Sequence, residues 1–252
     1  MDYTKILLPL LLCFLAGIFT VVGSLITFFI RDFKRSYLQF FLGLSGGVMI
    51  YISFVEFLPS SINKIGVLMA NLAFFAGIFL VMLIDFFTPH EYIAEKIKLD
   101  PHEKKIMAAG IFTAIGLGIH NFPEGLAVFM SALVNIKLGV ALAIAIALHN
   151  IPEGIAVAMP IFYATKSRKK AFWYSFLAGF AEPAGAVVAI LLLMPILTPA
   201  LLSFTMAFVA GIMVFISFDE LLPLSCQGEG YHISILGLIL GMAVMAASLI
   251  LM

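Results

Sequence analysis

The feature that most constrains this chain is a series of eight apolar segments, each long enough to cross a lipid bilayer as a helix. A membrane-spanning helix needs about 20 apolar residues, and the segments run over 6–30, 38–61, 66–87, 106–133, 137–163, 171–194, 200–224 and 232–252. The chain is 63% hydrophobic and only 11% charged, against about 45–50% and about 25% in soluble domains. We therefore predict an all-α integral membrane protein with eight transmembrane helices in one domain, residues 1–252.

Several function classes are disfavoured by what the sequence lacks. The formal net charge is zero, which argues against a nucleic-acid partner. No G-x-x-x-x-G-K-[ST] loop is present, so this chain is not expected to use ATP. The two cysteines, Cys13 and Cys226, lie far apart in the sequence and predict neither a disulfide framework nor a zinc ribbon.

The basic residues are distributed unevenly between the two sides of the predicted bundle. Eleven of the fourteen lysines and arginines lie in the connections after the first, third and fifth spans, whereas Lys5, Lys64 and Lys137 lie on the other side. Cytoplasmic loops of membrane proteins are enriched in lysine and arginine. The distribution therefore predicts a multi-pass protein of the cell membrane (plasma or inner membrane) with both termini outside.

The spans repeat one another at nearly constant offsets. The segment "SGGVMIYISFVEFLP" (45–59) matches "VAGIMVFISFDELLP" (209–223) at eight of fifteen positions without a gap. The segment "FLAGIFTVVG" (14–23) matches "FLAGFAEPAG" (176–185) at five of ten positions, again without a gap. Each pair runs in opposite directions in the predicted topology, as in the inverted repeats of many secondary transporters. We therefore predict a 3+2+3 arrangement, in which spans 1–3 are equivalent to spans 6–8 and span 4 to span 5.

Two copies of one polar motif lie in the middle of the fourth and fifth spans. "HNFPEG" begins at His120, and "HNIPEG" begins at His149 in the next span. Residues three or four apart share one face of a helix, so each copy aligns a histidine, an asparagine and a glutamate. With the glutamate of the sixth span, seven polar residues are predicted near the bilayer midplane: His120, Asn121, Glu124, His149, Asn150, Glu153 and Glu182.

A proline accompanies the glutamate in each of these three spans. Pro123, Pro152 and Pro183 lack the N–H that would bond the carbonyl four residues back. Such interruptions are tolerated in membranes where the freed carbonyls line a cavity. The pattern predicts helices broken at the midplane, with free carbonyls, among them that of Gly179, available to a cation.

Three glutamates at the centre of a membrane need a counter-charge. A charged side chain at the centre of a transmembrane helix costs about 2.5–3.5 kcal/mol, and no lysine or arginine lies near these glutamates in the spans. Either the carboxyl groups are protonated or a cation joins them, which argues strongly against an anionic substrate. Imidazole, carboxylate and amide ligands without thiolate suit Zn²⁺, Fe²⁺, Co²⁺ or Mn²⁺. The residues thus predict a divalent metal transporter whose site has enough ligands for two metal ions bridged by carboxylates.

Three other functions remain open on these residues alone. The polar residues can form a hydrogen-bond network that only joins helices. An intramembrane metalloenzyme is the second alternative, although H-N-x-P-E lacks the glutamate base and the second histidine of H-E-x-x-H. A metal-selective cation channel is the third, because a carrier and a channel need the same cation-lined path.

Acidic residues near the ends of two equivalent spans indicate further points on such a path. Glu56 lies near the outer end of the second span, and Glu220 lies beside Asp219 near the inner end of the seventh. Since Glu56 and Glu220 are equivalent in the repeat, we predict that these acids mark where a metal ion enters and leaves. Asp85 and His232, at the inner ends of other spans, are expected to be ordinary interfacial residues.

The paired H-N-x-P-E-G motifs, "AEP" at 181–183 and "SFDELLP" at 217–223 resemble the ZIP family of divalent metal transporters over essentially the whole chain. The resemblance implies uptake of zinc, iron(II), manganese and cobalt into the cytosol, as transported substrates rather than cofactors, by a non-enzymatic protein that is often a homodimer.

The resemblance also implies a binuclear midplane site. One ion, preferring zinc, would be held by His120, Glu124, His149 and Glu153. The second, in the position linked with Fe²⁺, would be held by Asn121, Asn150, Glu182 and the same two glutamates, with Glu182 in reach of both ions. The loop after the third span departs from the family pattern, because it carries only His90 and His102, and a metal reservoir in this loop is not expected.

Overall fold

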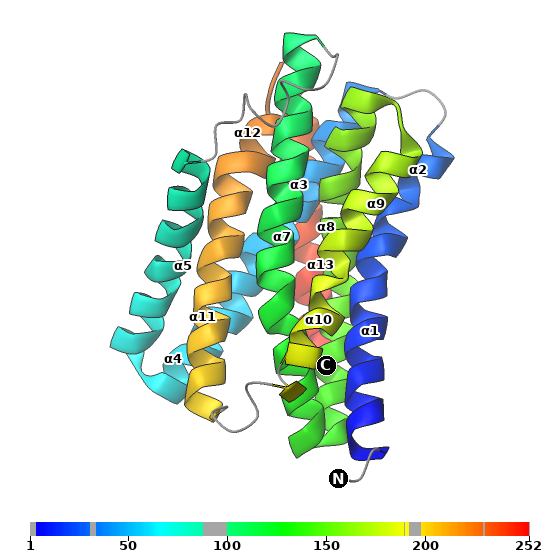
Figure 1. Cartoon of the computed structure of the whole chain (residues 1–252). Coiled ribbons are helices and arrows are strands. Elements are labelled where there is room, and N and C mark those ends of the chain that lie inside the picture. The colour runs from blue at the N-terminus through cyan, green and yellow to red at the C-terminus, as the bar shows by residue number, and fades with distance from the viewer. Residues whose placement is uncertain are drawn as a thin grey trace.

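The described part of the chain is a bundle of long helices (Figure 1). This computed structural model describes residues 4–30, 34–87, 100–188, 190–191, 198–228 and 230–251, and these ranges contain no strand. The predicted all-helical class is therefore confirmed. His90 lies outside the described residues.

Within these ranges, seven helices are long and apolar enough to cross a membrane, judged by length and composition. Four of them are continuous: α5 (Val67–Phe87), α7 (Pro101–Val134), α8 (Ile136–Thr165) and α13 (Tyr231–Leu251). The other three are composites that begin with α1 (Thr4–Ser24) and α2 (Ile26–Phe29), with α3 (Arg35–Ile52), and with α11 (Pro199–Ile216). Each of the seven overlaps one predicted span.

The sixth predicted span, 171–194, is described as two short helices. These are α9 (Arg168–Gly179) and α10 (Ala181–Val188), which meet at Phe180. Neither is long enough to count as a spanning helix by itself, and most of 189–197 lies outside the described residues. The interruption falls just before Pro183, whose missing N–H weakens the helix there.

The prolines of the two motifs do not interrupt their helices. α7 continues through Pro123 and α8 continues through Pro152, so the predicted breaks at these two positions are wrong. The two helices pack along each other, and such neighbours can support a membrane helix across one missing hydrogen bond. The Gly179 carbonyl, predicted to be available to a cation, lies against Gly17 of α1.

Two five-residue π-helical turns occupy equivalent positions of the repeat. η1 (Ser53–Phe57) follows α3 and leads into α4 (Leu58–Ile65), whereas η3 (Ser217–Leu221) follows α11 and leads into α12 (Leu222–Ser225). They contain Glu56 and Glu220 respectively, and a proline follows each turn after one residue. Turns of this kind are rare and occur frequently at functional sites, so the local geometry singles out the same two acids as the sequence repeat.

The helices pack in two groups. In the first, α1, α7, α8, α9 and α10 contact one another; in the second, α3 packs along α13 and α11 along α5. Gly47 of α3 lies against the Leu238 carbonyl of α13, and its equivalent Gly211 of α11 lies against the Phe74 carbonyl of α5. A Cβ atom on these glycines would lie 2.1 and 1.9 Å from backbone oxygen, so only glycine permits this approach. The groups meet where α3 contacts α8 and α11 contacts α7.

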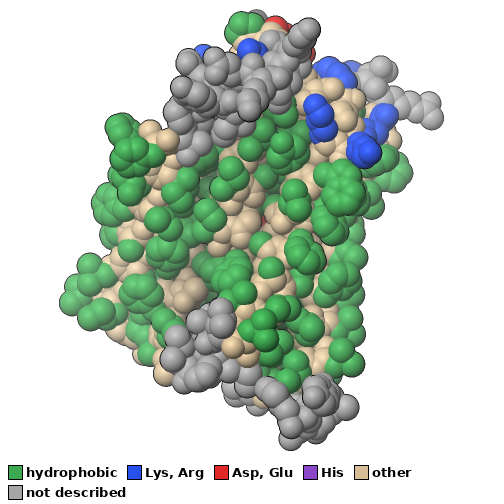
Figure 2. All heavy atoms as spheres, viewed as in Figure 1, with side chains coloured by type: hydrophobic (Ala, Val, Ile, Leu, Met, Phe, Trp, Pro, Cys, Tyr) green, Lys and Arg blue, Asp and Glu red, His purple; other side chains and the backbone are tan. Residues whose placement is uncertain are grey.

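The surface of the bundle is mainly apolar along its length (Figure 2). Large side chains such as Phe29, Phe86 and Ile250 are at least 80% exposed, far more apolar exposure than a water-soluble protein tolerates in long contiguous areas. Lysine and arginine side chains gather at one end of this view, and the N-terminus lies at the other end. The described residues therefore form a multi-pass membrane protein.

Candidate metal centre

The seven polar residues predicted at the midplane are buried together inside the first helix group. Three come from α7, three from α8 and one from α10, and none of the seven side chains is more than 1% exposed. They are His120, Asn121, Glu124, His149, Asn150, Glu153 and Glu182. Such complete burial of three carboxyl groups requires compensating interactions.

Each motif histidine contacts the glutamate of the other motif copy. His120 Nε2 lies 2.9 Å from Glu153 Oε1, and His149 Nε2 lies 3.3 Å from Glu124 Oε2. His149 Nε2 also lies 3.9 Å from Glu153 Oε1 on its own helix. These crosswise contacts join α7 to α8 and bring two imidazoles and two carboxyl groups to one position.

The side-chain amide of each motif asparagine is held by a backbone carbonyl. Asn121 Nδ2 donates to the Ala178 carbonyl at 3.2 Å, and Asn150 Nδ2 donates to the Ala16 carbonyl at 3.0 Å. Ala16 and Ala178 are equivalent positions in the sequence match between 14–23 and 176–185. Because the amide nitrogens are occupied by backbone carbonyls, the Oδ1 atoms are the groups left to bind a ligand.

Glu182 is positioned by a close approach between α7 and α10. A Cβ atom on Gly125 would lie 2.0 Å from the Glu182 carbonyl, so the backbones can touch only because residue 125 is glycine. Asn150 Nδ2 also donates to Glu182 Oε1, which ties this carboxyl group to the second motif. The Cys13 thiol donates to the Gly125 carbonyl at 3.2 Å on the α1 side of this approach.

Most of the buried side-chain nitrogen and oxygen atoms that lack a hydrogen-bond partner among the described residues lie in this centre. Six of its buried polar atoms have no hydrogen-bond partner among the described residues: His120 Nδ1, Asn121 Oδ1, Glu124 Oε1, Asn150 Oδ1, Glu153 Oε2 and Glu182 Oε2. Each can offer a lone pair, and buried groups of this kind normally have partners. The donor set of nitrogen and oxygen lone pairs, with three carboxyl groups among them, is suited to binding cations.

A cavity of about 200 Å³ lies on the side of this centre toward the end of the bundle that holds the N-terminus, the end predicted to face outward, and is called the outer cavity (Figure 1). It is lined by residues of α3 to α4, α7, α8, α11 and α13. Ala127 and Ile146, two of its lining residues, stand three positions from Glu124 and His149 along their helices. Since a helix rises about 1.5 Å per residue, the inner end of the cavity is roughly one helical turn from the buried site.

The polar lining of this outer cavity includes Glu56, the acid predicted to mark the outer end of the path. Two oppositely charged side chains and four hydroxyl groups line it: Glu56, Lys64, Ser60, Ser61, Ser131 and Ser203. Lys64 was not predicted to belong to this path, because a cavity between helices is formed by tertiary packing. Its position close to two helical turns after Glu56 on the same helical segment was the one local signal that the two side chains share a face.

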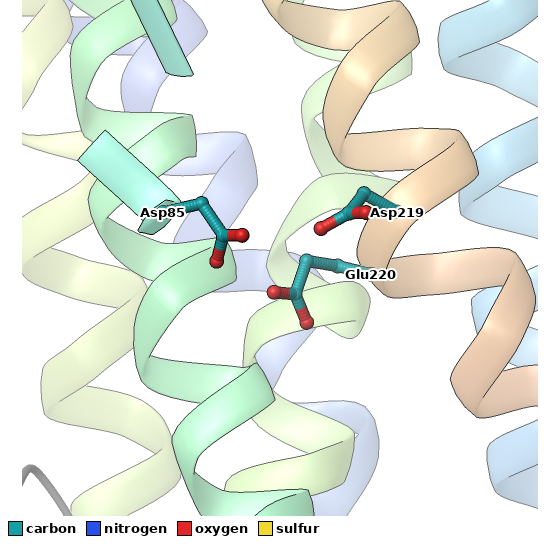
Figure 3. Close-up of side chains that lie close together, drawn as sticks. All are labelled: Asp85, Asp219 and Glu220. Atoms are coloured by element: carbon teal, nitrogen blue, oxygen red, sulfur yellow. The ribbon is translucent and has the colours of Figure 1, made fainter. Parts of the chain in front are cut away.

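The acids predicted at the inner end form a cluster with a third acid. Asp219 and Glu220 of η3 and Asp85 of α5 have carboxyl oxygens within 4.8 Å of one another, and the three side chains point toward a common centre (Figure 3). Glu220 is buried, whereas Asp219 is exposed. Asp85, expected to be an ordinary interfacial residue, is brought next to Glu220 by the packing of α5 on α11, and that expectation stays a prediction. His232 is exposed and lies against Tyr231, with ring centroids 4.1 Å apart.

Comparison with known proteins shows that this chain is similar to zinc transporters. The family model described as "ZIP Zinc transporter" matches residues 89–249, a range that contains both motifs, Glu182 and Glu220. The chain is 50% identical to the zinc transporter ZupT of Chlorobium phaeovibrioides, over 96% of this chain and 97% of that protein. It is 48% identical to ZupT of Oceanobacillus iheyensis, over 98% and 99%, and 47% identical to ZupT of Streptococcus mutans, over 94% of each.

Proposed function

Since the chain belongs to the ZIP family of zinc transporters, we propose that it carries divalent metal ions into the cytosol. Zinc is the first substrate, and iron(II), manganese and cobalt are further ones, because the seven ligands offer nitrogen and oxygen without thiolate. The observation that supports this most is the burial of three carboxyl groups with two imidazoles and two amides in an apolar bundle. Family membership excludes the metalloenzyme, and the metal ions are transported substrates rather than cofactors.

The proposed site holds two ions that share two carboxylates. His120, Glu124, His149 and Glu153 bind the first ion, because the crosswise histidine–glutamate contacts assemble the four-ligand set that zinc prefers. The second ion is bound by Asn121, Asn150, Glu182 and the same two glutamates. With neutral imidazoles, the formal charge of the three carboxylates falls from −3 to −1 with one divalent ion and becomes +1 with two.

A polar network that only joins helices is a weaker explanation of the same residues. Structural networks in low-dielectric surroundings are stabilising when their members are satisfied, whereas six atoms in this centre lack partners among the described residues. Each buried polar group left unsatisfied costs about 1–3 kcal/mol. Bound cations would supply the missing interactions.

Alternating access is favoured over an open channel by the burial of the centre. All seven ligands are at most 1% exposed, so in this conformation the site is closed to water on both sides. A carrier passes through such an occluded or closed arrangement in each cycle, whereas a conducting channel requires a continuous path.

Purified protein in proteoliposomes tests this function. We expect saturable Zn²⁺ uptake, competition by Fe²⁺, Mn²⁺ and Co²⁺, and counter-flow when the vesicles are loaded with metal. Equilibrium binding in detergent should give two divalent ions per chain. Non-saturating flux without counter-flow would support the channel, and the absence of metal flux in protein that binds no metal would contradict the proposal.

We also propose that the chain is one domain over 1–252, with eight spans in the 3+2+3 inverted repeat. Equivalent structural features in the two matched pairs of segments support this arrangement. The π-helical turns coincide when 45–59 is matched with 209–223, and the carbonyls that accept from the motif asparagines coincide when 14–23 is matched with 176–185. The sixth span is then α9 together with α10.

In the proposed orientation, both termini face outward and the basic end of the bundle faces the cytosol across the plasma or inner membrane. A cysteine at Asn63 should react with a membrane-impermeant maleimide on intact cells, and one at Lys169 should not, with Cys226 changed to serine in both. Both positions are exposed, so the opposite labelling pattern would overturn the orientation. A homodimer in the bilayer is part of the proposal, and cross-linking in native membranes tests it.

The outer cavity predicts opposite effects of its two charged residues. Glu56 attracts an arriving cation and Lys64 repels it, since both line the cavity. Glu56→Gln should raise the KM for external Zn²⁺ about two- to fivefold and Lys64→Gln should lower it by a similar factor, because interactions between partly exposed charges are worth about 0.5–1 kcal/mol. Uptake kinetics at two salt concentrations measure this, and both shifts should shrink at high salt. Changes of equal sign would contradict a charge effect.

At the inner end, Glu220→Gln should slow Zn²⁺ influx several-fold and leave equilibrium binding at the midplane unchanged. Glu220 lies beside Asp85 and Asp219, so its carboxylate can bind a cation transiently on the way to the cytosol. Removing this charge raises the free-energy barrier to release of the metal ion at the inner end. Asp85→Asn should act in the same direction. Glu103→Gln, an acid at the start of α7 outside the cluster, is the control. Wild-type influx in both cluster variants would remove these acids from the path.

A further inference from the structure

The side chain of Thr20 is buried in the helix group that contains the metal centre, and its hydroxyl group has no hydrogen bond to the described residues. Thr20 of α1 is 0% exposed, and its Oγ1 has no hydrogen-bond partner among the described residues. A helical threonine usually bonds a carbonyl three or four residues back, as Thr27 does with Ser24 at 2.9 Å. An orphaned hydroxyl in the interior of a membrane protein is unfavourable unless a ligand satisfies it.

Thr20 occupies the position that is equivalent to Glu182 in the inverted repeat. The sequence match that aligns Gly17 with Gly179 also aligns Thr20 with Glu182. A Cβ atom on Gly179 would lie 2.8 Å from Thr20 Cβ, and one on Gly17 would lie 3.3 Å from Glu182 Cβ. Thr20 and Glu182 therefore each pack against the equivalent glycine of the other's helical segment, Gly179 and Gly17 respectively.

The backbone contacts of these two residues with the motif helices match as well. A Cβ atom on Gly154 would lie 1.8 Å from the Thr20 carbonyl, and one on Gly125 would lie 2.0 Å from the Glu182 carbonyl. Gly125 and Gly154 are equivalent and directly follow the motif glutamates. Thr20 thus approaches α8 as Glu182 approaches α7, and its Cβ and Oγ1 lie against Gly179, next to Ala178, whose carbonyl accepts from Asn121.

We propose that Thr20 is an eighth residue of the metal site and positions a water ligand of the second ion. The inference rests on the proposed binuclear function. Glu182 bonds Asn150, so the equivalent place for Thr20 is beside Asn121. The threonine oxygen is two bonds nearer to its Cα than a glutamate oxygen is, so Thr20 would reach the metal ion through one bridging water molecule. With the five oxygen-donor residues named above, this water completes the six-oxygen coordination that suits manganese.

The substitution that isolates this role is Thr20→Val, which keeps the branched shape against Gly179 and removes the hydroxyl. We expect it to weaken binding of Mn²⁺ at the second position about tenfold, as removal of groups that support metal ligands does, with Zn²⁺ binding at the first position unchanged. Thr20→Ser restores the hydroxyl and should bind Mn²⁺ within about twofold of wild type. The electron paramagnetic resonance spectrum of bound Mn²⁺ should change in Thr20→Val alone, because its water shell changes.

Thr27→Val is the matched control, since Thr27 lies on α2, is equally buried and has a satisfied hydroxyl. Mn²⁺ titration and Zn²⁺ titration of the purified proteins separate the outcomes. Equal Mn²⁺ affinity in Thr20→Val and wild type would overturn the inference, and so would an equal loss for Mn²⁺ and Zn²⁺, which indicates a packing defect. Wild-type protein that binds a single ion would overturn the binuclear proposal itself.

Discussion

Zinc uptake is expected to fall at least about 100-fold when Glu124 or Glu153 is replaced by alanine, while the protein still reaches the membrane. The two glutamates are the carboxylates that both proposed ions share, and each contacts the histidine of the other motif. Loss of groups that merely support metal ligands already costs about 10–100-fold in metal affinity, so loss of a shared ligand should be more severe. Vesicle uptake of Zn²⁺ and the number of bound ions per purified chain measure the effect.

Two further variants separate loss of a ligand from loss of the fold. Glu124→Gln keeps the shape of the side chain and removes its charge, and it should be nearly as inactive as Glu124→Ala. Glu103→Ala changes another glutamate of α7, near the helix start and away from the centre, and should transport like wild type. Near-normal uptake in Glu124→Ala would remove the midplane site from the transport path.

The second large loss of uptake is expected from substitution of Gly125, a residue that is not a metal ligand. Gly125→Val should abolish uptake, because any Cβ at this position would lie 2.0 Å from the Glu182 carbonyl and α10 must move away from α7. Overpacking of this kind typically costs about 1–3 kcal/mol of stability, and it also displaces Glu182 from the site. The thermal stability of the purified protein and the number of bound metal ions should both decrease.

Gly118→Val is the matched control on the same helix. Nothing lies within 4 Å of a Cβ atom built on Gly118, so valine is accommodated there and should leave uptake and thermal stability close to wild type. If Gly125→Val also transports normally, the close approach of α7 and α10 is unnecessary for function. If Gly118→Val is equally inactive, the loss reflects valine in α7 rather than the contact with Glu182.

The membrane-spanning helices were predictable because hydrophobic length is a local property. α5 and α13 agree closely with their predicted spans at both ends, since an apolar stretch of this length forms a helix in lipid whatever its neighbours are. The resemblance to the ZIP family, confirmed by the comparisons, was predictable for a similar reason, because the motifs that carry it are short and contiguous.

The local geometry around the prolines was less predictable. Pro123 and Pro152 were expected to break their helices, yet α7 and α8 continue through them. Whether a proline breaks a membrane helix depends on what neighbouring helices provide for the backbone. The π-helical turns that carry Glu56 and Glu220 likewise had no recognised sequence signal, although the proline after each turn is a candidate cause.

By itself, the sequence determined which polar side chains of this protein gather in the bundle, because carboxyl groups in apolar spans cannot remain alone. It did not determine their partners. On one helix, His120 and Glu124 stand a turn apart, but in the structure His120 contacts Glu153 and Glu124 contacts His149. The crossing of α7 and α8 decides these pairs. In the same way, the packing of α5 on α11 brings Asp85 to Glu220, and the packing of α1 on α9 brings Thr20 to Gly179. Which residues of two different helices come into contact depends on how closely the two backbones can approach. That distance is set by the side chains of both helix surfaces together, so only the tertiary structure decides it.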